Sequence, residues 1–173
     1  NSVVANHTIA ASFAIDTFTI AASAGSGGAI APSGQVKVNH GSNQTFTITP
    51  AANYHVLDVL VDGKSVGAVT TYTFNSVAAN HTIAASFAID TYTITASAGS
   101  GGAIAPSGQV KVNHGANQAF TITPSPNYHV LDVLVDGKSV GAVTTYTFNS
   151  VAANHTVAVS FAIDTYTITA SAG

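Results

Sequence analysis

The sequence predicts an all-β fold made of small β domains in tandem. Apolar and polar side chains alternate along short runs, which is the pattern of a strand with one buried face. Glycine, asparagine and aspartate separate these runs, and these residues favour turns. No segment has the apolar spacing of an amphipathic helix. Each domain should contain about six or seven short strands, in a sandwich-like arrangement or a rolled sheet.

The sequence repeats itself with a period of 74 residues. Residues 16–89 and 90–163 align without gaps, and we interpret them as two complete repeats. Residues 1–15 match the C-terminal part of a repeat, and residues 164–173 match its beginning. We therefore interpret 1–15 as the end of a preceding repeat and 164–173 as the first strand of a following one.

Six runs in the second repeat have strand character, and their equivalents occur in the first repeat. These runs are 91–98, 109–114, 119–124, 130–135, 146–151 and 155–163. The run VLDVLV at 130–135 is apolar on both faces, which predicts the most buried strand. The dipeptide Asp136-Gly137 predicts a two-residue hairpin turn into KSV. The segments AGSGGAIAPSG and VNHGAN are expected to be loops.

The alternation also predicts which side chains face the core. In the first repeat this set contains Phe18, Ile20, Val36, Val38, Phe46, Ile48, Leu57, Val59, Val61, Tyr72, Phe74, Ile83 and Phe87. The equivalent residues of the second repeat lie 74 positions later.

The apolar face changes parity where one repeat meets the next. Phe161 and Ile163 occupy odd positions, whereas Tyr166 and Ile168 occupy even ones. Because one residue of slip turns every side chain to the opposite face, we expect a boundary, a sharp bend or a bulge around Asp164. No flexible linker intervenes, so the repeats are expected to form a semi-rigid rod.

Composition excludes several classes of partner. Only 6% of the residues are charged, the net charge is −3, and there is no cysteine. A chain with four basic residues offers no basic patch for nucleic acid. Apolar runs are also too short for insertion into a membrane.

No arrangement of residues predicts catalysis, a cofactor or a metal site. The seven histidines lack the close spacing of metal ligands, and two aspartates near each hairpin fall short of the ligand number that calcium requires. Serine, histidine and aspartate are present, but no nucleophile motif accompanies them. We therefore expect a protein that is not an enzyme.

The whole repeat resembles a known family. TYTITASAGSGGAIAPSGQVKVNHGANQAFTITPSPNYHVLDVLVDG, followed by TYTFNSVAANHTVAVSFA, is similar to the divergent internalin B-repeat domain of bacterial secreted and cell-surface proteins. Asn53 and Asn127 stand where that family usually has glycine, and asparagine tolerates the same left-handed backbone. The resemblance implies an extracellular or cell-surface location, a stalk or adhesive role, and no shared catalytic residues.

Two functions are compatible with these observations. The first is a structural segment of an extracellular bacterial stalk or fibre, in which neighbouring repeats or copies pair with strands at Asn6–Ala14 and Thr165–Gly173. The alternative is a multivalent adhesin that recognises a glycan or a host surface. For that alternative, the candidate contact residues are Tyr54, His55, Tyr128 and His129.

Overall fold

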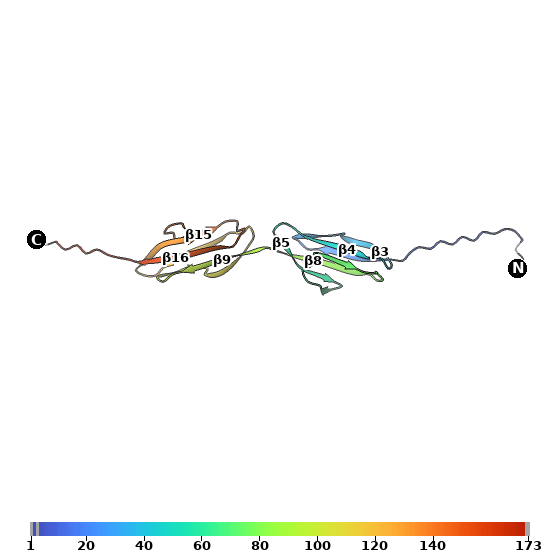
Figure 1. Cartoon of the computed structure of the whole chain (residues 1–173), viewed down its shortest axis with the longest axis horizontal. Helices are drawn as coiled ribbons and strands as arrows, with labels where there is room; N and C mark the ends of the chain where they lie inside the picture. Colours follow the sequence, from blue (N-terminus) through green and yellow to red (C-terminus); the bar gives the residue numbers. More distant parts are fainter. Residues whose placement is uncertain (1, 3, 172–173) are drawn as a thin grey trace. The chain divides into compact units, whose positions relative to one another are not determined.

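The computed structural model describes residue 2 and residues 4–171, and the chain divides into two compact units, Asn1–Ala88 and Ile89–Gly173 (Figure 1). Strands and connecting turns, without a helix, make up the described residues. The predicted all-β fold in tandem domains is confirmed. The units divide close to the predicted repeat boundary at 89–90.

The described residues of each repeat form eight strands. In the first they are β1 (Thr17–Ala24), β2 (Gly28–Ala31), β3 (Gly34–Asn39), β4 (Gln44–Pro50), β5 (Tyr54–Val61), β6 (Lys64–Ser65), β7 (Thr71–Phe74) and β8 (His81–Ile89). In the second they are β9 (Thr91–Ala98), β10 (Gly102–Ala105), β11 (Gly108–Asn113), β12 (Gln118–Pro124), β13 (Tyr128–Val135), β14 (Lys138–Ser139), β15 (Thr145–Phe148) and β16 (His155–Ile163).

The strands of each unit form two sheets. A five-stranded sheet has the order β3-β1-β8-β5-β6, and a three-stranded sheet has the order β2-β4-β7. The second unit repeats this topology as β11-β9-β16-β13-β14 and β10-β12-β15. The first and last strands of a repeat are neighbours and run parallel. In the first repeat β1 lies beside β8, and in the second β9 lies beside β16 (Figure 1).

The core of each unit lies between its two sheets. Phe46 and Ile48 of the small sheet are buried against Ile20, Val59 and Ile83 of the large one. The second unit has an equivalent cluster around Phe120. The units are therefore sandwiches, which decides between the two predicted arrangements.

The prediction for Leu57 and Leu131 is wrong, because both side chains are 58% exposed. The preceding residues, Val56 and Val130, are buried instead. In the second unit the pairing of β13 with β16 shifts register between Val130 and Asp132, which is a β-bulge. The extra residue turns Leu131 outward, so VLDVLV is not buried on both faces.

The prediction of a loop throughout AGSGGAIAPSG is also wrong. Gly28–Ala31 and Gly102–Ala105 form strands β2 and β10, which pair antiparallel with β4 and β12. Ile30 and Ile104 anchor these strands in the core. Each of these strands has only one large apolar residue, the isoleucine, so alternation of apolar and polar side chains did not reveal it.

The predicted turn chemistry is confirmed. Asp136 and Gly137 connect β13 to β14, and both have positive φ, 50° and 76°. Positive φ at both central positions is the requirement of a type I′ turn. Asn53 and Asn127 adopt φ of 65° and 64°, so asparagine does replace glycine in the left-handed region.

In the first repeat the equivalent hairpin turn is Asp62-Gly63, which connects β5 to β6. An aspartate–histidine pair fixes this turn to the start of β8. The Thr82 N–H donates to Asp62 Oδ1 at 2.8 Å, and His81 Nδ1 lies 2.7 Å from Asp62 Oδ2. These contacts, the Thr82 hydrogen bond first, hold the pKa of Asp62 below its usual value. The His81 ring packs on Phe74 with centroids 4.8 Å apart.

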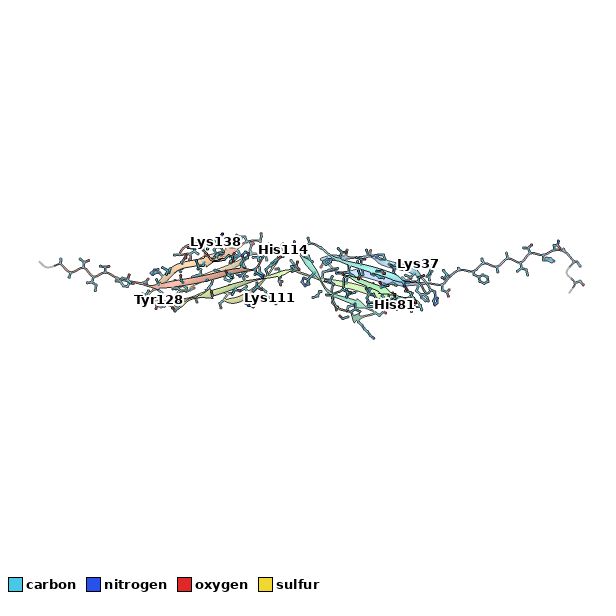
Figure 2. All side chains as sticks on the ribbon, viewed as in Figure 1. Lys37, His81, Lys111, His114, Tyr128 and Lys138 are labelled. Atoms are coloured by element: carbon cyan, nitrogen blue, oxygen red, sulfur yellow. The ribbon has the colours of Figure 1, made fainter. Side chains whose placement is uncertain are left out.

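All four lysines of the protein lie on edge strands of the five-stranded sheets. Lys37 and Lys64 are on β3 and β6, and Lys111 and Lys138 are on β11 and β14. Figure 2 labels Lys111 and Lys138 on opposite sides of the second unit. Lysine on an edge discourages pairing with a foreign strand, so these edges are protected against aggregation.

The terminal segments add no strand to either sandwich within the described residues. Within the described residues, 4–16 and 164–171 contain no strand, and Ile9 and Ile168 are 95% and 94% exposed. Their equivalents one repeat away, Ile83 and Ile94, are fully buried. Pairing of Asn6–Ala14 and Thr165–Gly173 with another copy stays a prediction, and residues 172–173 lie outside the described residues.

Substitution of Gly28 should destabilise the first unit. A methyl group there would overlap the Phe87 ring, whereas one at Gly25 would make an ordinary contact 3.6 Å from the Ala85 carbonyl oxygen. We expect Gly28→Ala to lower the free energy of unfolding by about 1–3 kcal/mol and Gly25→Ala to change it far less. Urea unfolding followed by circular dichroism measures both, and equal midpoints for the two variants would contradict the packing argument.

The aspartates of the hairpin turns should make stability depend on acid pH. Their pKa is lower in the folded chain than the unfolded value of about 3.9, so their stabilisation is complete above that value and is lost as pH falls through the folded pKa. Asparagine keeps the turn and an acceptor but does not titrate. We expect Asp62→Asn/Asp136→Asn to melt below the unsubstituted chain at pH 7.

The same comparison at low pH provides the control. As the pH falls through the lowered pKa of these carboxyl groups they become protonated, so the difference in melting temperature should shrink. Melting curves recorded from pH 7 to pH 2.5 measure this convergence. Parallel pH profiles for the two proteins would show that these aspartates do not carry the effect.

Candidate functional site

The tyrosines of the predicted contact set begin strands β5 and β13. Tyr54 and Tyr128 are half-buried, and each ring lies against the backbone of a glycine, Gly27 or Gly101. That contact requires glycine, because a Cβ at either position would overlap the ring. One face of each ring is therefore used for packing within the repeat.

The histidines that follow them point to solvent. His55 and His129 are exposed, and His129 Nδ1 lies 2.8 Å from Asp164 Oδ1. Successive residues of a strand face opposite sides, so the tyrosine and histidine of each pair do not converge on one cavity. Contact of these four residues with a glycan stays a prediction.

A different feature, here called the polar hollow, lies on the second unit. It is a cavity of about 360 Å³ on the five-stranded sheet. All of its lining residues have polar side chains, and they are Thr93, Thr95, Gln109, Asp136, Asn154, His155 and Thr156.

The polar hollow is built where the first and last strands of the repeat pair. Thr95 of β9 lies opposite Gln109 of β11 on one side and beside Thr156 of β16 on the other. The three side chains therefore form a row across adjacent strands, with a spacing of about 4.8 Å between strands. The hairpin turn after β13 closes one side of the hollow with Asp136.

Hydrogen bonds hold several of these groups in place. The Asn154 Oδ1 accepts the Thr93 N–H at 2.8 Å. Asp136 accepts the Thr156 N–H at 2.8 Å, and its second oxygen lies 2.7 Å from His155 Nδ1. His155 also packs on the Phe148 ring with centroids 4.9 Å apart.

These contacts also set the charge of the site. Partial burial acts to raise the pKa of Asp136, but the hydrogen bonds from His155 and the Thr156 N–H outweigh it and lower the pKa. The carboxyl group is consequently ionised at neutral pH. Since a carboxylate accepts and does not donate, the His155 Nδ1 carries the proton that joins them.

The site has the composition of a binding surface for polar molecules. Among the described residues, no three histidine or acidic side chains gather to hold a metal ion. Hydroxyl and amide groups predominate instead, with one carboxylate. Such groups donate and accept hydrogen bonds with neutral polar ligands.

The first repeat has the same construction with one difference. Asn80 Oδ1 accepts the Thr19 N–H at 2.8 Å, and the contacts of Asp62 with His81 and Thr82 match those of the second repeat. Ala21 occupies the position of Thr95. The first repeat therefore lacks one hydroxyl of the row.

Sequence reasoning did not identify the polar hollow. The repeated tripeptide Asn-His-Thr at 154–156 is a visible signal, as is the Asp136-Gly137 turn. The pairing that brings them to Thr93 and Thr95 is parallel and joins residues about 60 positions apart. No local pattern indicates which strands become neighbours in this way.

Comparison with known proteins identifies the family. No curated protein matches this chain. The family described as the divergent InlB B-repeat domain matches it twice in succession, over residues 18–91 and 92–165. These two matches cover most of the sequence and coincide with the two sandwiches, so the chain belongs to the divergent InlB B-repeat family.

Proposed function

We propose that this chain is a structural segment of an extracellular bacterial stalk or fibre built from tandem β repeats. Repeats of this family are typical of bacterial surface proteins, and two of them follow each other directly here. The described residues contain no helix long and apolar enough to cross a membrane. The proposed role is mechanical and not enzymatic.

The parallel pairing of β1 with β8 carries this proposal. Force on a tandem array enters a repeat at the start of its first strand and leaves at the end of its last. Because these strands are parallel neighbours, such a force slides them past each other along their length. Every hydrogen bond between them is then loaded together, whereas an antiparallel hairpin pulled from its open end breaks its bonds one at a time.

Further contacts reinforce this pair. The aligned residues run from Ile20 beside His81 to Ala24 beside Ala85. The Gly25 N–H extends the ladder by donating to the Ala85 carbonyl oxygen at 2.9 Å. At the other end the Asn80 side chain accepts the Thr19 N–H. Both ends of the parallel pair are thus held by additional hydrogen bonds.

The connection between repeats suits the same role. β8 ends at Ile89 and β9 begins at Thr91, so one residue, Asp90, separates strands of two different sheets. A connector this short has little freedom to extend before the strands bear load. It supports our proposal that the repeats form a semi-rigid rod.

The terminal segments would extend such a stalk. Residues 7–15 repeat the sequence of β8, and residues 165–171 repeat that of β9. We propose that Asn6–Ala14 and Thr165–Gly173 pair with strands of neighbouring repeats or copies. Their exposed apolar side chains would then be buried as their equivalents are.

A second candidate function is multivalent binding to a surface glycan. The polar hollow favours it, since a concave polar site on one repeat would recur along an array. Repetition of a weak site raises the overall strength of attachment without a new contact. This function is compatible with the stalk, because a stalk can carry binding sites along its length.

Single-molecule pulling of the full chain tests the mechanical proposal. Handles at the two termini should give two unfolding events, each releasing at most about 270 Å of chain from 74 residues at 3.3–3.6 Å per residue. The control is Thr17→Cys/Asn39→Cys, which places handles at one end of the antiparallel pair of β1 and β3. The absence of native cysteine makes the attachment specific.

The two geometries should differ in force. Terminal handles shear the parallel pair, so unfolding should need a clearly higher force than the first rupture in the control. Equal forces, or a lower force through the termini, would contradict a load-bearing role for the pairing of β1 with β8.

A further inference from the structure

We infer that the polar hollow is a binding site for a neutral saccharide. This inference deepens the second candidate function and rests on it, and it does not depend on the mechanical role. It places recognition on the paired strands β9 and β16 and not on the tyrosines at 54 and 128.

The dimensions of the hollow suit a small polar ligand. Its volume of about 360 Å³ is at the lower end of the range of roughly 300–1,000 Å³ for small-molecule sites. The hollow is shallow because it lies on the face of a sheet. Side chains such as Thr93, Gln109 and Asn154 form its walls. One sugar ring of a longer chain could lie there while the rest of the chain remains in solvent.

The chemistry of the lining favours a neutral polar ligand over an anion, an apolar molecule or a cation. One lining residue is a carboxylate and none is lysine or arginine, which disfavours an anion in the hollow; Lys111, which pairs with Thr93, lies outside the lining. The apolar surface of the lining comes from threonine methyl groups and the His155 ring, without a leucine, valine, isoleucine or phenylalanine side chain, so a purely apolar ligand would leave the amide, hydroxyl and carboxylate groups unpaired. Both oxygens of Asp136 already accept hydrogen bonds, which reduces the attraction for a cation. The ligand class that fits this lining best is therefore a neutral molecule with several hydroxyl groups.

The free hydrogen-bonding groups match those of a saccharide. Asn154 is fixed through its oxygen, which leaves its NH₂ group as an oriented donor without a protein partner among the described residues. The Gln109 amide and the Thr95 hydroxyl likewise have no protein partner there. Sugar hydroxyls both donate and accept, so they can satisfy all three groups.

The groups are also held in position before a ligand arrives. Asn154 and Asp136 accept backbone N–H groups of neighbouring strands, and His155 is held between Asp136 and Phe148. Threonine on a strand has restricted rotamers. A ligand therefore loses less affinity to the ordering of side chains than it would on a loop.

The first repeat provides an internal comparison. It retains the asparagine, histidine, aspartate and glutamine of the hollow but has Ala21 in place of Thr95. The hydroxyl of Thr95 lies at the centre of the row between Gln109 and Thr156. We expect the first repeat to bind the same ligand more weakly.

NMR titration of the full chain tests this inference. The probes are cellotetraose, mannotetraose and chitotetraose, with tetragalacturonate as an anionic control. At least one neutral probe should shift the amide signals of Thr95 and Thr156 and the side-chain NH₂ signals of Gln109 and Asn154. Thr95→Ala should weaken that binding about three- to tenfold, the value of one hydrogen bond.

Two variants that swap the residues of the two repeats at this position separate an effect on binding from an effect on folding. Thr95→Ala reproduces the residue that the first repeat has naturally, so loss of binding does not arise from misfolding. Ala21→Thr should create shifts of comparable size at Gln35 and Thr82. Absence of shifts with every neutral probe, shifts centred on Tyr54 or Tyr128, or no effect of Thr95→Ala would each overturn the inference. Because the chain is unloaded in solution, none of these outcomes bears on the stalk.

Discussion

The pairing of the first strand of each repeat with its last is the constraint on which the rest of the structure depends. Parallel neighbours cannot be joined by a tight turn and need a long crossover. In each repeat six strands, β2–β7 or β10–β15, provide that crossover, and three of them form the second sheet. The core is therefore enclosed by the path that brings the two end strands together, and one repeat contains all the strands of its own sandwich.

Local features of this design could be predicted from the sequence because they depend on neighbouring residues. The alternation in TYTITASA or QAFTITP reports a strand with one face in the core, and Ile94 and Phe120 are buried as expected. The Asp136-Gly137 turn follows from the backbone freedom of those two residues. Asn53 likewise adopts the left-handed backbone that its place in the repeat requires.

Features that depend on partners distant in sequence could not be predicted in the same way. Leu131 looks like a core residue until the bulge opposite Ser160 shifts it outward, and Asp132 then receives hydrogen bonds from the Val133 N–H and Ser139 hydroxyl. Strand β10 consists of small residues apart from Ile104, and it is recognised by its pairing with β12. The polar hollow was missed because it depends on which strands become neighbours.

The parallel pair of β9 and β16, which would bear load, also carries the polar hollow, so the two proposed functions share one part of the structure. Thr93 and Thr95 lie on β9, whereas His155 and Thr156 lie on β16, so a ligand in the hollow would contact both strands that force drives apart. A ligand that binds only the folded arrangement stabilises it by a free energy that rises with the logarithm of the free ligand concentration relative to Kd. Binding of a ligand would then strengthen the pair of strands that transmits the load. This effect would be larger in the second repeat, which has Thr95 in the polar hollow, than in the first, which has Ala21 at the equivalent position.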